Sequence, residues 1–85
     1  MDDDILVTYQ RQSDGTWTVR LARPVKLAGG TKWAVRTIRN ADVPQVVAEI
    51  ATSTGAIEVK PRLDSRGRPG FVLRYADETV EWLPE

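Results

Sequence analysis

The stretch that decides the fold is DVPQVVAEIATSTG, residues 42–55. Its apolar side chains recur at intervals of three and four residues and predict one stripe on a helix: Val43, Val46, Val47, Ile50 and Ala51. We expect Asp42 to cap this helix, with Pro44 in its first turn and Gln45 in the capping-box position. Gly55 suits the left-handed conformation that ends a helix. Burying the stripe gains less free energy than ordering the segment costs, so the helix must lie on a sheet.

Alternating apolar and polar residues predict strands on both sides of the helix. Three precede it: Ile5–Arg11, Thr16–Ala22 and Lys32–Ile38. Three follow it: Ile57–Arg62, Phe71–Tyr75 and Thr79–Leu83. Pro24 and Gly29-Gly30 predict a loop at Arg23–Gly30, with at most a short extended piece at Val25–Leu27. Pro61 cannot donate a backbone hydrogen bond, which indicates a sheet edge or the end of its strand.

This order, β-β-β-α-β-β-β, predicts a single α+β domain over residues 1–85. We expect a largely antiparallel sheet with the helix packed on one face. Val47 and Ile50 should be buried there against the inward-facing side chains of Trp17, Val19, Trp33 or Val59. The opposite face should then carry Thr18, Arg20, Arg36, Lys60, Arg62 and Arg74. Trp82 fits either the core or an interface.

Composition excludes several classes of site. The 85 residues contain no cysteine, which excludes disulfides and thiolate metal sites, and no histidine, the commonest general base. No catalytic motif is present, so we expect a protein that is not an enzyme and has no cofactor or metal. Asp2–Asp4 could hold a hard cation, but an acidic tail that is disordered over residues 1–4 is the interpretation we favour. The short apolar runs and acidic N-terminus predict a cytoplasmic protein without a membrane partner.

The charges are sorted along the chain although they sum to zero. Residues 11–39 hold seven basic residues and one acid, and residues 60–74 hold five basic residues and one acid. This pattern indicates one basic and one acidic surface. The candidate nucleic-acid-binding residues are Arg20, Lys32, Arg36, Lys60, Arg62, Arg66, Arg68 and Arg74. The alternative is a sheet face kept in solution by charged side chains, some of them paired with Glu58 or Glu81.

The loop Arg66-Gly67-Arg68-Pro69 is similar to the core of an AT-hook, whose extended backbone places two arginines in a narrow minor groove. The structural alternative is a flexible hairpin loop. Trp17 and Trp33 could likewise stack on bases, although inward-alternating positions favour core roles for both.

Residues 9–54 resemble the arm-type DNA-binding domain of phage tyrosine integrases. The similarity lies in the Asp14-Gly15-Thr16-Trp17 hairpin, in the strand after Gly30 and in the helix that follows. In that family a three-stranded sheet backed by a helix lies in the major groove, which implies groove or phosphate contacts for Arg20, Lys32 and Arg36. Residues 55–85 continue as strands, where an integrase begins a helical domain.

A weaker resemblance is to HicB-type antitoxin domains, which share the order β-β-β-α-β. It implies a protein partner in place of nucleic acid. We therefore expect a small binding module that contacts nucleic acid through a basic sheet face. The alternative is a protein-interaction module such as an antitoxin, or a phage-encoded inhibitor or adaptor. These functions differ in their salt response, because phosphate contacts weaken steeply with salt whereas an apolar interface does not.

Overall fold

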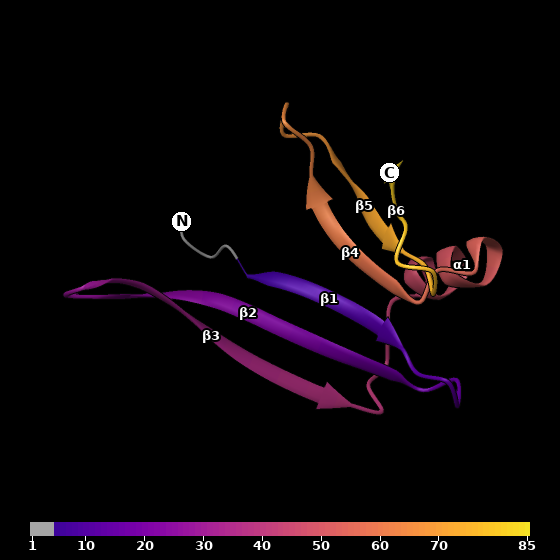
Figure 1. Ribbon diagram of the computed structural model, residues 1–85, viewed down its shortest axis with the longest axis horizontal. Helices are drawn as coiled ribbons and strands as arrows, with labels where there is room; N and C mark the ends of the chain where they lie inside the picture. The colour runs from indigo at the N-terminus through magenta and orange to yellow at the C-terminus, as the bar shows by residue number, and fades with distance from the viewer. Residues whose placement is uncertain (1–4) are drawn as a thin grey trace.

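The computed structural model describes residues 5–85 as a small α+β domain with a six-stranded antiparallel sheet and one helix (Figure 1). In chain order the elements are β1 (Leu6–Arg11), β2 (Trp17–Leu27), β3 (Gly30–Arg39), α1 (Gln45–Thr54), β4 (Glu58–Leu63), β5 (Pro69–Arg74) and β6 (Val80–Pro84). The predicted order is confirmed. Residues 1–4, with the predicted acidic tail, lie outside the described part of the chain.

The strands lie in the order β3-β2-β1-β4-β5-β6, so each half of the chain forms three neighbouring strands. Short turns connect the strands within each half, and these turns enforce antiparallel pairing. The segment containing α1 carries the chain from the β3 edge back to the far side of β1. Figure 1 shows α1 at the end of the sheet where β4 begins and β5 ends.

The two halves meet at a short seam between β1 and β4. Strand pairing there covers Tyr9 with Val59 and Gln10 with Glu58. The next bonded pair in this register would need an N–H from Pro61 to the Val7 carbonyl, and proline has none. The Arg62 guanidinium takes its place, since Nη1 donates to the Val7 oxygen at 3.0 Å and to the Pro61 oxygen at 2.8 Å. Pro61 was predicted to mark an edge or the end of its strand. It does not end β4, which continues to Leu63, but it lies where the β1 side of β4 is no longer paired.

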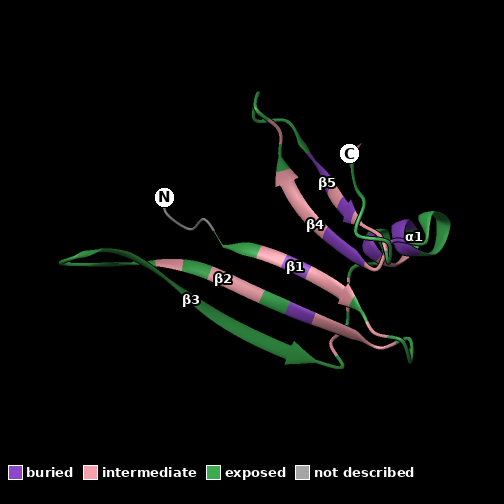
Figure 2. Cartoon of the chain, in the orientation of Figure 1, coloured by how far each residue is buried: buried purple, intermediate pink, exposed green. Residues whose placement is uncertain are grey.

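The core lies almost entirely under α1 (Figure 2). Val47, which is 1% exposed, and Ile50, which is 9% exposed, pack with Ala56 of the α1–β4 connection and with three buried strand residues: Val59, Phe71 and Leu73. Trp17 is partly buried against this cluster, as are Val43 and Tyr9. The predicted burial of Val47 and Ile50 against Val59 and Trp17 is confirmed. Val46 differs from the prediction, because it is exposed on the outer side of the helix.

The helix begins later than its sequence predicts. Pro44 occupies the N-cap position in an extended conformation, and no side chain caps the helix. A residue before proline avoids helical dihedral angles, so Val43 cannot extend the helix backwards. The predicted Asp42 cap is therefore wrong, and Gln45 donates to Glu49 Oε2 instead of closing a capping box. Gly55 ends the helix as predicted, with φ of 81° and its N–H bonded to the Ala51 carbonyl.

The predicted loop at Arg23–Gly30 is wrong, because β2 continues through Pro24 to Leu27. β1 begins at Leu6, opposite Ala22, so Pro24 pairs with Trp33 of β3 just beyond the end of β1. A proline is tolerated where its missing N–H would face no partner strand. Within residues 5–85 the sheet has only two strands beyond this point, and β2 and β3 continue as a ribbon to the turn at Ala28-Gly29.

Candidate nucleic-acid interface

The sheet has a helix face, where Val59 and Leu73 contact α1, and an open face on its other side. Residues opposite each other in register share a face, so the strand pairing assigns every sheet residue to one face. Trp33 pairs with Pro24 and lies on the open face, 49% exposed, so its predicted place in the core is wrong. Arg36 pairs with Leu21 and lies on the helix face, although an open-face position was predicted.

Among residues 5–85, most of the basic residues that form no ion pair lie in the β2–β3 arm, Trp17–Arg39. It contains six Lys and Arg residues and no Asp or Glu. Its register places three on each face. Arg20, Lys26 and Arg39 lie on the open face, and Arg23, Lys32 and Arg36 lie on the helix face. Within residues 5–85, none of the six forms an ion pair. All ten residues of β3 are exposed (Figure 2).

Each face of the arm has a shallow depression lined by two arginines. On the open face, Arg20 and Arg39 border a polar depression whose other side chains include Thr18 and Thr37. Guanidinium and hydroxyl donors together suit a phosphate group. On the helix face, Arg23 and Arg36 border a more apolar depression whose other side chains on that face are Ile5, Leu21 and Ala34. The arm therefore offers cationic contacts to a ligand on both sides.

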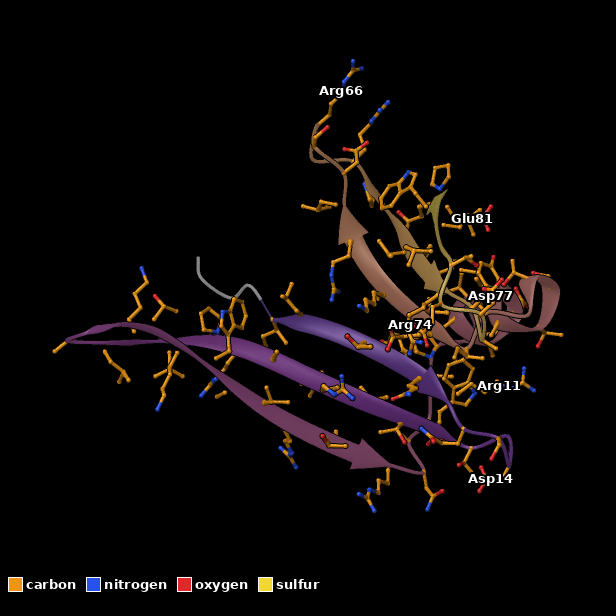
Figure 3. The ribbon with its side chains drawn as sticks, in the orientation of Figure 1. Arg11, Asp14, Arg66, Arg74, Asp77 and Glu81 are labelled. Carbon is orange, nitrogen blue, oxygen red and sulfur yellow. The ribbon has the colours of Figure 1, made fainter. Side chains whose placement is uncertain are left out.

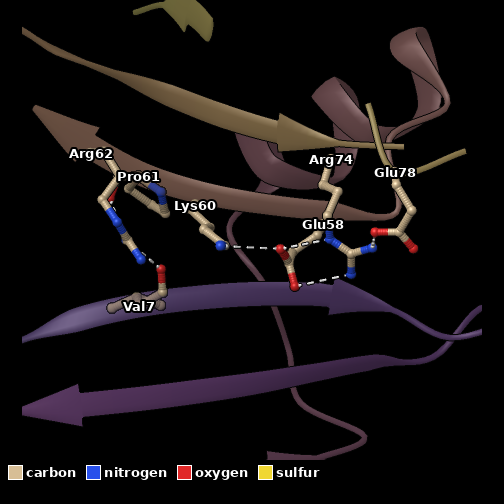
Figure 4. A network of polar contacts seen from close by, with 7 residues as sticks. All are labelled: Val7, Glu58, Lys60, Pro61, Arg62, Arg74 and Glu78. Atoms are coloured by element: carbon tan, nitrogen blue, oxygen red, sulfur yellow. Dashed lines mark hydrogen bonds and ion pairs between the residues drawn. The ribbon is translucent and has the colours of Figure 1, made fainter. Parts of the chain in front are cut away.

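Lys60 of β4 and Arg74 of β5 are engaged with acidic residues of the same half (Figure 4). Glu58, a buried residue, accepts from Arg74 Nε at 3.1 Å and lies 3.3 Å from Lys60 Nζ. Arg74 also pairs with Glu78 at 3.3 Å. Burial alone would raise the pKa of Glu58, but Arg74 and Lys60 outweigh it and lower the pKa below its ordinary value. These three ion pairs leave little of the charge of Lys60 and Arg74 for a ligand.

Arg62 is also committed within the fold, because its guanidinium bridges the seam between Pro61 and Val7. Burial lowers the pKa of Arg62 and the nearby Glu58 charge opposes that change. Its role is to supply a donor that the proline lacks. Sequence patterns mark Arg62 only as one more basic strand residue.

The Arg66-Gly67-Arg68-Pro69 loop is a closed turn. Asp64 Oδ1 accepts the backbone N–H groups of Arg66 and Arg68 at 2.8 Å, and Asp64 Oδ2 accepts from Arg68 Nε at 3.0 Å. These hydrogen bonds hold the pKa of Asp64 below its ordinary value, against a smaller effect of burial. The turn is not the extended backbone that an AT-hook requires. Figure 3 shows Arg66 at the tip of this hairpin, pointing away from the sheet.

The predicted site residues therefore do not form one basic plate. Arg20, Lys60, Arg62 and Arg74 share the open face, but the last three have partners within the chain. The arm also contains three basic residues that the prediction did not name, beside the predicted Arg20, Lys32 and Arg36. They are Arg23, Lys26 and Arg39. The signal that could have found them is the block of residues 11–39, with seven basic residues and one acid.

No side-chain constellation in the described residues resembles a metal site: residues 5–85 bring together no group of three or more potential ligands from His, Cys, Asp or Glu. Over the same residues, no helix has both the length and the apolar character needed to cross a membrane. Comparisons with protein-family models, with curated proteins and with solved structures find no match. The resemblances to integrase arm domains and to HicB-type domains stay predictions.

Proposed function

We propose that this chain is a small non-enzymatic module that binds nucleic acid through the β2–β3 arm. The observation that carries the proposal is the charge of the arm: it has six basic residues and no acidic residue, and every residue of β3 is exposed. Such a segment attracts a polyanion at long range and exchanges its counterions for phosphates on contact.

The shape of the arm supports the same proposal. A two-stranded β-ribbon fits the major groove of duplex DNA, which is about 12 Å wide. Among residues 5–85, only β2 and β3 form the arm beyond Pro24, which is the two-stranded form that such a groove admits. Its basic residues lie on both faces, where they can meet phosphates on either side of a groove.

The test is the salt dependence of binding to a labelled duplex, measured by fluorescence anisotropy. Contact with the three basic residues of one face predicts a log–log slope of about −2.7, and contact with all six about −5.4. Arg36→Gln should reduce the slope by about one unit and weaken binding to all sequences alike.

Arg66→Gln is the matched control, because Arg66 is also exposed but lies at the tip of the β4–β5 hairpin (Figure 3). It should leave both affinity and slope unchanged. The proposal is overturned if the wild-type slope is shallower than about −1, or if Arg66→Gln weakens binding as much as Arg36→Gln does.

A protein-interaction module is the second candidate, and the free edge of β3 favours it. All ten residues of this edge strand are exposed, and three of them are large and apolar: Trp33, Val35 and Ile38. An exposed edge can accept an extended segment of a partner through backbone hydrogen bonds. A pull-down with and without nuclease separates the candidates, because nuclease removes only partners that nucleic acid bridges.

A further inference from the structure

We propose that the open face of the β2–β3 arm binds single-stranded nucleic acid, with a base stacked on Trp33 and phosphates held by basic residues on either side. The inference rests on the proposed function. It adds that the nucleic acid is single-stranded and that Trp33 is the residue that favours a single strand over a duplex.

The centre of this surface is an exposed apolar patch that spans three strands. Trp33 pairs with Pro24, and the neighbouring row contains Val35, Ala22 and Leu6 in register. Trp33 is 49% exposed and Val35 is 58% exposed. No helix covers the patch, because α1 lies on the other face of the sheet. An indole on a flat apolar surface has the features of a stacking platform for a base.

Basic residues flank the patch at both ends of the same face. Arg20 lies two residues before Ala22 on β2, and Lys26 lies two residues after Pro24. Six residues of strand place Arg20 and Lys26 about 20 Å apart, a span that several nucleotides of an extended strand can follow. Arg20 also borders the polar depression that contains Arg39 and Thr37. An apolar centre between two cationic ends matches the alternation of bases and phosphates in a single strand.

A single strand fits this surface better than a duplex does. In a duplex the bases stack on one another and present only their edges in the grooves, so an indole on a sheet face cannot reach a π-face. An unpaired base can stack on the indole while its phosphates contact the flanking cations. The helix face of the arm has two arginines at its depression but no aromatic residue there. Because Trp33 lies on the open face, we expect the single strand to bind there.

The experiment compares Trp33→Leu with the wild-type chain, using a labelled oligothymidine and a labelled duplex of equal length. We expect Trp33→Leu to weaken single-strand binding about 5- to 150-fold and to leave duplex binding within about twofold. Trp33→Phe retains a π-face and should recover much of the single-strand affinity. Trp82→Leu is the matched control, since Trp82 pairs with Val72 near the opposite edge of the sheet and should not affect binding.

Three outcomes would overturn the inference. If single-strand binding depends on salt but is equally tight in Trp33→Leu and wild type, Trp33 does not stack on a base. The proposed function would still hold in that case. No salt-dependent binding to either form removes both. If a synthetic peptide of alternating acidic and apolar residues binds more tightly than oligothymidine, and Trp33→Leu weakens it, the patch belongs to a protein partner.

Discussion

The N-terminal half of the sheet, β1–β3, and the C-terminal half, α1 with β4–β6, use their apolar residues in opposite ways. In the C-terminal half, Val59 and Leu73 are fully buried under α1. In the N-terminal half, Trp33 and Val35 are exposed and β3 has no buried residue at all. One half therefore provides most of the packing free energy, and the other presents a surface that packing does not require.

Charge differs between the halves in the same way. Lys60 and Arg74 of the C-terminal half are bound to Glu58. The six basic residues of the arm have no acidic neighbour on their own strands, because residues 17–39 contain none. A basic side chain that is paired within the fold has its charge neutralised there, whereas one with no acidic partner among residues 5–85 is available to a ligand. The comparison therefore separates residues that hold the fold from residues that are available for binding.

The sharpest test of this division compares two apolar truncations. Leu73→Ala removes a side chain that is 0% exposed and should lower the free energy of unfolding by about 2–5 kcal/mol, enough to unfold much of so small a domain. Val35→Ala removes a side chain that is 58% exposed and should change it by less than about 0.5 kcal/mol. Urea denaturation measures both. Similar losses in the two variants would break the comparison.

Within the C-terminal half, Gly70→Ala tests how closely β5 and β6 pack. A Cβ at Gly70 would overlap the Trp82 ring and lie 2.8 Å from the Leu83 carbonyl oxygen. The Trp82 side chain must move, at a cost of about 1–3 kcal/mol in thermal or urea unfolding. Combining the substitution with Trp82→Ala should recover part of that loss. If Gly70→Ala left the stability unchanged, Trp82 of β6 would not pack closely against Gly70.

The seam between the halves depends on Arg62. Arg62→Met keeps much of the apolar stem but leaves the Val7 and Pro61 carbonyls without this donor. The free energy of unfolding should therefore fall by about 0.5–1.5 kcal/mol. Pro61→Ala supplies the missing N–H and should restore stability when added to Arg62→Met. If the effects of the two substitutions simply add, Arg62 does not replace the proline's donor.

The smallest expected effect is the pH dependence of the stability that Glu58 contributes. Because Arg74 and Lys60 lower the pKa of Glu58 in the folded chain, Glu58 contributes stability that is fully present above the unfolded pKa of about 4.3. That contribution is lost as the pH falls through the lower folded value. The stability difference between wild type and Glu58→Gln should therefore be constant near neutral pH and shrink below about pH 4.3. A difference that grows on acidification would contradict this assignment.

The sequence predicted the elements well where local patterns decide the structure. The stripe containing Val47 and Ile50, the αL residue Gly55 and the alternation in each strand all depend on near neighbours. Asp42 was misassigned because a competing local preference, that of the residue before Pro44, decided where the helix begins. Pro24 was misassigned because its place in a strand depends on where the neighbouring strand ends. Pro44 displaced the cap, and the start of β1 at Leu6 made Pro24 acceptable in a strand.

The candidate site was harder to predict because it depends on register and strand order. Alternation shows that Trp33 and Arg36 face opposite ways, but not which of them faces α1. Both faces of the edge strand β3 are exposed, so the apolar residues of this strand do not indicate which of its faces lies toward α1. Likewise, the pairing of Glu58 with Arg74 follows from the β4–β5 register, which brings residues 16 positions apart into contact.

The most direct test of the division between folding and binding is an NMR titration of the ¹⁵N-labelled chain with oligothymidine at low salt. We expect the largest chemical-shift changes in β2 and β3, with the Trp33 indole among them, and little change in α1 and β4–β6. Changes concentrated in the β4–β5 hairpin or around α1, with β3 unaffected, would contradict this expectation.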